Sequence, residues 1–386
     1  MIRSLPKLLI HATVAILVLA GAAVAIASRS DADAPPPAKP LAEAIHDALS
    51  APAPAGVSGR IAFSNNLVED AAVPNGGVSP LLSGAEGRFW VAGDGRARLE
   101  LQSDAGDAQV RLDGDRVSLY DPASDTVYRM ALPAAPATDR DAAPTAGGIQ
   151  LALTRLAQTV TLSEAEPGTV AGKAAYTVRL SPRHDGGLVG AAEVAWDAAH
   201  GMPLRAAVYA QGEDEPVLEL EATDVDFGPV AERDVAPPEP RGARVVEIEA
   251  AEQGHDEVDD RGRLGAKAAF DAVQAKLSFP LSAPASVAGL PRRSLRTVRV
   301  DGRTGALATY GKGLGALLVL EAPAGDSGGL QGGGLPGVQR LSLDGTTAHE
   351  VATALGTIVQ FERDGVAYTV LGSVPPAAAE AAARAL

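Results

Sequence analysis

A serine flanked by glycines is the first feature of this sequence that could carry chemistry. Ser327 lies in Gly325-Asp326-Ser327-Gly328-Gly329, the pentapeptide that surrounds the nucleophile in chymotrypsin-like serine proteases. Such a serine needs a histidine base oriented by a third group. In those enzymes the histidine comes first, whereas Thr347-Ala348-His349 follows Ser327 here and has no cysteine beside it. Seven glycines between positions 325 and 337 make the loop too flexible to hold a nucleophile. The sequence therefore favours an insertion between strands over a protease.

The string Gly311-Lys312-Gly313 resembles part of a phosphate-binding loop, but it does not meet the sequence requirements of that motif. Its spacing from Gly305 is one residue too long, and no serine or threonine follows Lys312. A strand is expected next, where a phosphate loop needs a helix. We interpret the string as a glycine turn between strands.

The acidic residues do not form a recognisable metal site or an acid/base pair either. In the run Glu252–Asp260, His255 is followed by four carboxylates, but the run lacks the alternation and the turn glycine of a calcium loop. Glu100, Glu219 and Glu221 alternate with apolar residues, which any half-exposed strand shows. The sequence thus predicts no catalytic residue, no metal site and no cofactor, and it argues against an enzyme.

Charge and cysteine content exclude several classes of partner and of chemistry. The formal net charge of -15 would repel a phosphate backbone, so the sequence predicts no nucleic-acid binding. The absence of cysteine excludes disulfides, thiol chemistry and a lipid-modified cysteine. A total of 386 residues with 46% hydrophobic content is enough for about two packed domains.

The first 28 residues predict a targeting segment. Arg3 and Lys7 precede an almost wholly apolar run from Leu8 to Ala27, whose length is close to the roughly 20 residues of a spanning helix. This length favours an uncleaved N-terminal anchor, while Ala25-Ile26-Ala27 keeps a cleaved secretory signal open. Either way, the rest of the chain is expected outside the cytoplasm. Residues 29–40 form a Pro/Ala-rich linker that holds the next domain off the membrane.

Beyond the linker, two helices accompany a long series of strands. Leu41, Ile45 and Leu49 recur at helical spacing, and Ile149–Val160 predicts a second helix. Short alternating runs separated by turn residues predict an antiparallel meander. Thr169–Pro182 is expected as one strand, and Ala191–Trp196 and Leu204–Tyr209 form a hairpin through His200-Gly201. The Pro-rich break Val235–Gly242 separates a domain at 41–234 from a smaller one at 241–386, in which residues 264–277 predict a helix.

The alternation predicts a sheet with one apolar face. The side chains of that face either pack against one another or leave room for a ligand. The candidate cavity residues are Phe89, Val91, Leu99, Leu101, Val110, Leu112, Leu119, Val178, Leu180, Val194 and Trp196. The candidate lid residues on the two helices are Leu41, Ile45, Leu49, Leu153 and Leu156.

Two stretches carry a family resemblance. Gly87–Leu101 (GRFWVAGDGRARLEL) with Arg116–Met130, and Trp196–Ala210 (WDAAHGMPLRAAVYA) with Leu218–Gly228, resemble segments of LolA/RseB-like lipoprotein-carrier half-barrels, including those of the LppX/LprG kind. The similarity spans about residues 40–230. It implies an α+β fold, namely a curved antiparallel half-barrel sheet with helices plugging its mouth, followed here by a smaller C-terminal α+β domain.

The resemblance also implies a function. We expect a membrane-anchored extracytoplasmic protein that binds a lipid or an acylated lipoprotein as a carrier or an envelope sensor. The alternative is an envelope-stress regulator that binds an anti-sigma factor or another membrane protein through a self-filled half-barrel. The chain departs from the family in lacking the lipobox cysteine of the LppX/LprG-type lipoproteins and in its predicted anchor.

Overall fold

The computed structural model describes residues 34–67, 80–102, 106–122, 124–132, 145–183, 187–238, 240–248, 266–300, 303–325 and 337–386. The predicted anchor at 1–28, the acidic run at 252–260 and Ser327 lie outside these ranges. Within them, the structure contains no helix with the length and apolar character needed to cross a membrane.

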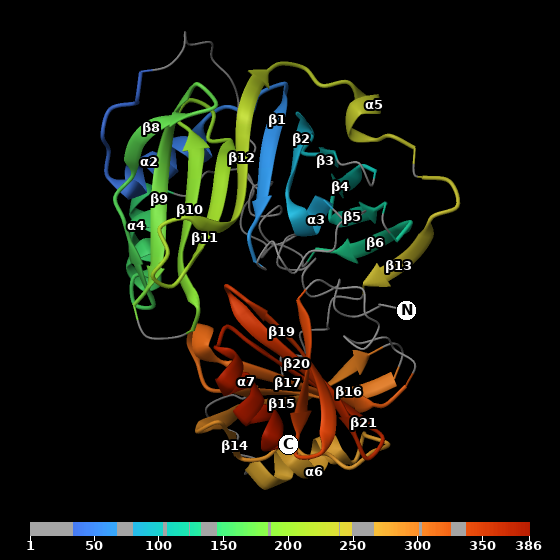
Figure 1. Ribbon diagram of the computed structural model, residues 1–386. Coiled ribbons are helices and arrows are strands. Elements are labelled where there is room, and N and C mark those ends of the chain that lie inside the picture. The colour runs from blue at the N-terminus through green and yellow to red at the C-terminus, as the bar shows by residue number, and fades with distance from the viewer. Residues whose placement is uncertain are drawn as a thin grey trace.

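Two sheets form the described part of the chain (Figure 1). The first has the order β13-β6-β5-β4-β3-β2-β1-β12-β11-β10-β9-β7, with β8 paired to β9. Its strands are β1 (Gly56–Asn65), β2 (Ala85–Ala92), β3 (Ala97–Gln102), β4 (Ala108–Asp113), β5 (Arg116–Asp121), β6 (Thr126–Ala131), β7 (Val160–Leu162), β8 (Glu166–Val170), β9 (Lys173–Pro182), β10 (Val189–Asp197), β11 (Pro203–Ala210), β12 (Pro216–Phe227) and β13 (Arg244–Ile248). The predicted meander and the hairpin through His200-Gly201 are confirmed.

Turn residues explain where the predicted strand at Thr169–Pro182 is wrong. Ala171 and Gly172 both have positive φ, 50° and 70°, so they form a tight turn that splits the run into β8 and β9. Two consecutive positive φ values suit the twist of a two-residue hairpin. Alanine rarely adopts this conformation, so the sequence gives little warning of the turn.

The first sheet is strongly curled. Val117 on β5 and Leu204 on β11 line the same small cavity, although six strand steps separate them in the sheet order. At about 4.8 Å per step, a flat sheet would hold them roughly 29 Å apart. The sheet therefore bends back on itself, and its apolar side becomes the inside of a half-barrel. This confirms the predicted α+β class with a curved antiparallel sheet.

Two helices cover one end of that inner face, and they are named the lid helices here. α2 (Leu41–Ser50) and α4 (Ala146–Leu156) pack with Tyr176, Val178 and Trp196 of β9 and β10. α4 begins three residues before the predicted Ile149, because the Thr145 hydroxyl caps it by accepting a hydrogen bond from the Gly148 N–H. It ends earlier than predicted, because Val160–Leu162 joins the sheet as β7.

The segment that follows β12 stays attached to the first sheet. α5 (Glu232–Val235) lies in the linker, where the Asp234 and Pro237 carbonyls accept hydrogen bonds from Arg98 and Arg111. Residues 244–248, which fall within the range 241–386 predicted as the C-terminal domain, form β13, which pairs in parallel with β6. The backbone of β6 offers an unpaired edge there, and a strand emerging from the linker satisfies it.

The second sheet has the order β14-β15-β16-β17-β21-β20-β19-β18. Its elements are α6 (Ala266–Gln274), β14 (Ser286–Val287), β15 (Leu290–Val300), β16 (Arg303–Tyr310), the 3-10 turn η2 (Gly313–Gly315), β17 (Leu317–Pro323), β18 (Val338–Leu343), β19 (Thr346–Thr353), β20 (Gly356–Arg363), β21 (Val366–Gly372) and α7 (Pro376–Arg384). α7 packs on a core that includes Leu317, Val359 and Phe361. Gly311-Lys312-Gly313 lies between two strands, as predicted.

The two sheets touch through backbone hydrogen bonds. The Leu188 N–H donates to the Ser373 carbonyl at 3.0 Å and to its hydroxyl at 2.9 Å. The Ala354 N–H donates to the Leu67 carbonyl, also at 3.0 Å. Leu355 packs against the core of the half-barrel. The C-terminal sheet is thus docked on the half-barrel at two points far apart in sequence.

A pair of glycine substitutions tests how the lid is seated. Gly201 has φ +68°, and a Cβ there would meet the Ala48 carbonyl oxygen of α2 at 2.4 Å. Gly212 has φ +83° with open space around it. We expect Gly212→Ala to cost about 1 kcal/mol of unfolding free energy from backbone strain alone. Gly201→Ala should cost at least about 2 kcal/mol, because α2 must also shift. Urea denaturation measures both, and equal losses would contradict this seating.

Candidate functional site

The register places the predicted cavity residues on one face of the half-barrel. Directly paired residues of antiparallel strands point to the same side. One row of such pairs runs from β9 to β1 through Val178, Val194, Ala206, Leu220 and Phe63. Gly59 of β1, on the same side as Phe63, pairs with Phe89, from which a second row continues through Leu99, Val110 and Leu119. Val91, Leu101, Leu112, Leu180 and Trp196 lie two residues along their strands from members of these rows.

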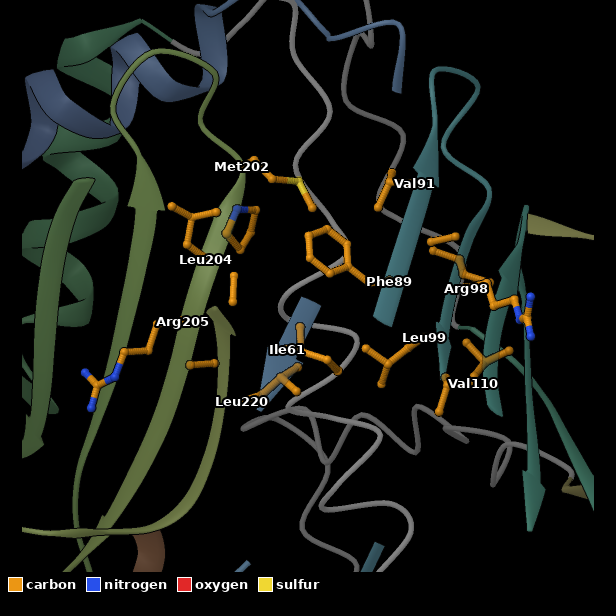
Figure 2. A pocket seen from close by; sticks show the side chains of 16 residues that line it. Ile61, Phe89, Val91, Arg98, Leu99, Val110, Met202, Leu204, Arg205 and Leu220 are labelled. Atoms are coloured by element: carbon orange, nitrogen blue, oxygen red, sulfur yellow. The ribbon is translucent and has the colours of Figure 1, made fainter. Parts of the chain in front are cut away.

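A cavity of about 110 Å³ lies on this inner face (Figure 2). Five of the predicted residues line it, namely Phe89, Val91, Leu99, Val110 and Leu112. Leu101 and Leu119 are buried in the core cluster around it. The opposite wall comes from β1, β11, β12 and the turn before β11, and it includes Leu220. Five of its residues were missed by sequence reasoning: Ile61, Met202, Leu204, Ala206 and Ala222. They show the same alternation, but only the curl of the sheet brings them opposite Phe89.

The other four predicted cavity residues lie elsewhere on the same face. Val178, Leu180, Val194 and Trp196 belong to the cluster beneath the lid helices. They pack against Leu41 and Ala44 of α2, and Leu153 of α4 packs against the same cluster. The indole N–H of Trp196 is buried without a hydrogen-bond partner among the described residues. This part of the face is filled by the lid and is separate from the cavity.

The cavity itself is apolar. Arg98 and Arg205 reach its wall only with their stems, and their guanidinium groups point away from it (Figure 2). On the outer face, Arg98 pairs with Glu100 and stacks on Trp90, with its guanidinium carbon 5.0 Å from the ring centroid. The charges of both arginines are therefore satisfied outside, and the cavity presents a hydrocarbon surface.

A polar network centred on Arg205 stabilises the outer face. Arg205 donates to Glu193 at 2.7 Å and to Glu219 at 2.6 Å, while the Tyr209 hydroxyl donates to Glu193 at 2.7 Å. Arg179 donates to the other oxygen of Glu193 at 2.7 Å. Burial alone would raise the pKa of Glu193, but these hydrogen bonds together lower it. Burial, and then the bond to Glu193, raise the pKa of Tyr209. Every group has a partner within the network. The role of the network is therefore to hold the four strands β9, β10, β11 and β12 together.

The buried pair Asp197 and His200 is the nearest approach to a catalytic dyad in the half-barrel. Nδ1 of His200 lies 2.5 Å from Oδ1 of Asp197, and its ring stacks on Phe227 with centroids 3.8 Å apart. The same Asp197 oxygen accepts the backbone N–H groups of Ala199 and His200. The pair therefore closes the β10–β11 turn. Within the described ranges, no three His, Cys, Asp or Glu side chains come together as a metal site.

The predicted lid residues mostly gather at an open groove between α2 and α4. Ile45 of α2 faces Leu153 and Leu156 of α4 across a space of about 310 Å³. Leu49 lies one turn beyond Ile45 on the same side of α2, and Leu41 is buried beneath the helix. Ile45 and Leu153 also pack against the cluster beneath the lid, so the groove adjoins that cluster.

Comparisons with known proteins found similar solved structures but no family. No protein-family model matches the chain, and no curated protein matches it. The similar solved structures include MucB in complex with MucA(peri), 20% identical with a TM-score of 0.39, covering 89% of this chain and 94% of that chain. They also include MucB alone, 18% identical with a TM-score of 0.34, covering 89% and 93%. A putative outer membrane lipoprotein-sorting protein domain from Vibrio parahaemolyticus is 12% identical with a TM-score of 0.17, covering 47% and 88%. The last is of the kind that the sequence resemblance named. At these values the likeness carries no conclusion about ligand or partner.

Replacing Glu193 tests the outer-face network. Because its folded pKa lies below the ordinary value of 4.5, Glu193 stabilises the fold above that pH. This contribution is lost as the pH falls through the folded pKa. We expect Glu193→Gln to lower the unfolding free energy at pH 7 by about 1.5–3 kcal/mol. The variant should also lose less stability than the parent between pH 5 and pH 3.

Urea denaturation across this pH range makes the measurement. Glu213, exposed in the turn after β11, provides the control, and Glu213→Gln should stay within about 0.5 kcal/mol of the parent. Indistinguishable pH profiles for the two variants would show that the network contributes nothing.

Proposed function

We propose that the chain is a non-catalytic, extracytoplasmic binding protein of the cell envelope that holds an acyl chain of a lipid or lipoprotein on the inner face of its half-barrel. The observation that carries the proposal is the apolar cavity, whose wall joins strands from both halves of the curled sheet. Burying an acyl chain there would gain about 0.8 kcal/mol for each methylene removed from water. The apolar run Leu8–Ala27 would attach the protein to the membrane, or direct its export if cleaved.

The size of the cavity limits what it takes without rearrangement. Its volume of about 110 Å³ is below that of typical ligand pockets, which begin near 300 Å³. A cavity of about 150 Å³ in another protein accepts a benzene molecule. The end of one acyl chain would therefore fit first. Deeper insertion would require movement of wall side chains or of the lid helices.

The small volume also favours a second candidate function. If the inner face serves mainly as a core, the half-barrel would be a scaffold that binds another envelope protein or an anti-sigma factor, as the sequence resemblance implies. Its ligand would then be protein, and the cavity would be a packing defect of the curled sheet.

Filling the cavity separates these two functions. Ala206 is buried and lines the wall, so Ala206→Leu adds three carbons to a space that already exists. We expect at least tenfold weaker binding of a fluorescent fatty acid, with a thermal midpoint close to that of the parent, because the new atoms occupy a void. Ala131→Leu, at an exposed position at the end of β6, is the matched control. Unchanged fatty-acid affinity in Ala206→Leu would contradict acyl binding in this cavity.

Native mass spectrometry of the exported protein gives the ligand directly. We expect adduct masses of a phospholipid, an acylglycerol or a fatty acid on the parent chain, and fewer adducts on Ala206→Leu. A bare mass that persists after lipid is added would reject the carrier function and leave the protein-binding scaffold.

A further inference from the structure

Exposed leucines concentrate on the lid helices. The large hydrophobic side chains most exposed in the described residues are Leu49, Leu151, Leu156, Val245 and Leu314. Three of the five lie on α2 and α4. Leu49 and Leu156, at 44% and 40% exposure, flank the groove of about 310 Å³ whose wall is almost entirely hydrocarbon. An apolar groove with an apolar rim is unusual on a surface that otherwise carries a net charge of -15.

α4 has the composition of a helix that lies at a membrane surface. Arg155 in its last turn is the single charged residue among its eleven. Ile149, Ala152, Leu153 and Leu156 face the groove at helical spacing, while Leu151 projects from the opposite side at 54% exposure. Gly147 and Gly148 leave space at the first turn, where an added Cβ would meet at most the Thr145 hydroxyl. A cationic residue beside exposed leucines suits the boundary between headgroups and acyl chains.

The linker brings this end of the half-barrel near the predicted anchor. The Tyr176 hydroxyl donates to the Pro37 carbonyl at 2.6 Å, and Lys39 pairs with Ala165, so the chain is fixed to the domain from Pro37 onward. α2 follows at once with Leu41. Ten residues connect Ala27, the end of the apolar run, to Pro37, and fully extended they reach about 33 Å. α2 is therefore the first helix after a membrane anchor, α4 packs beside it, and Pro37 stays within this reach of the anchor.

We propose that the groove between α2 and α4 is a membrane-docking site whose occupant is a phospholipid acyl chain from the bilayer that holds the anchor. Leu49 and Leu156 enter the interfacial region, and the acyl chain lies between Ile45 and Leu153. This inference rests on the anchor included in the proposed function. It extends that function by placing the lid, in addition to the inner cavity, in contact with lipid.

Single cysteines test the docking cleanly, because the chain contains none of its own. Leu156→Cys and Leu49→Cys, each carrying an environment-sensitive fluorophore, report from the groove. Leu314→Cys is the matched control, since Leu314 has 45% exposure on η2 of the C-terminal sheet. The full chain is reconstituted into phosphatidylcholine vesicles with or without a phospholipid that carries a quencher on its acyl chain. We expect at least fivefold stronger quenching at positions 49 and 156 than at position 314.

Each other outcome overturns the docking and also identifies what failed. Co-flotation with the vesicles but equal quenching at all three positions rejects the docking and leaves the anchor in place. A blue-shifted, unquenched label at position 156 means that a protein segment occupies the groove, either a second copy or this chain's own N-terminal run. Loss of co-flotation rejects the anchor and the docking together. Acyl binding in the inner cavity is measured separately with Ala206→Leu, so its failure is distinguishable from all of these.

Discussion

The curl of the first sheet is the constraint on which the rest of the structure depends. It brings apolar side chains from distant strands opposite one another. Strands β2 to β5 form one wall of the cavity, and β11 and β12 form the other. The bending also sorts the charges. Arg205, Glu193 and Glu219 must lie outside, where they pair with one another across β10, β11 and β12. An arginine on the inner face would have no such partners, and burying it unpaired would be prohibitively costly.

The inner face is filled unevenly, and this determines what the molecule offers to a ligand. At β9 and β10 the lid helices supply the missing layer, and Trp196 and Val178 are covered by Leu41 and Ala44. Beside Phe89 and Leu204 a cavity remains, and none of its lining residues belongs to a helix. Sheets need a second layer to bury their apolar side. Where the chain provides only part of that layer, an apolar cavity remains.

Much of the fold was predictable because it is local. The alternation along Gly87–Ala92 and Arg116–Asp121, with its turn residues, identified strands and hairpins correctly. The errors arose where one residue decided the outcome. Ala171 adopts a conformation that glycine normally supplies, and Thr145 caps α4 before the periodic apolar pattern begins. For the site, Phe89 and Val110 could be predicted as members of an apolar face. Ile61 and Leu204 could not be placed opposite them, since that depends on how far the sheet bends.

The parallel pairing of β13 with β6 has a mechanical consequence. β13 is the last strand of the half-barrel sheet before the chain continues to the C-terminal sheet, so a tension carried along the chain from the second sheet would act first on β13. Pulling along the strand loads its row of five residue pairs in shear, and they must break together. Pulling across the strand opens the pairs one at a time, beginning at the Ile248–Met130 end. The same short strand therefore resists force along its axis strongly and separates easily under force across it.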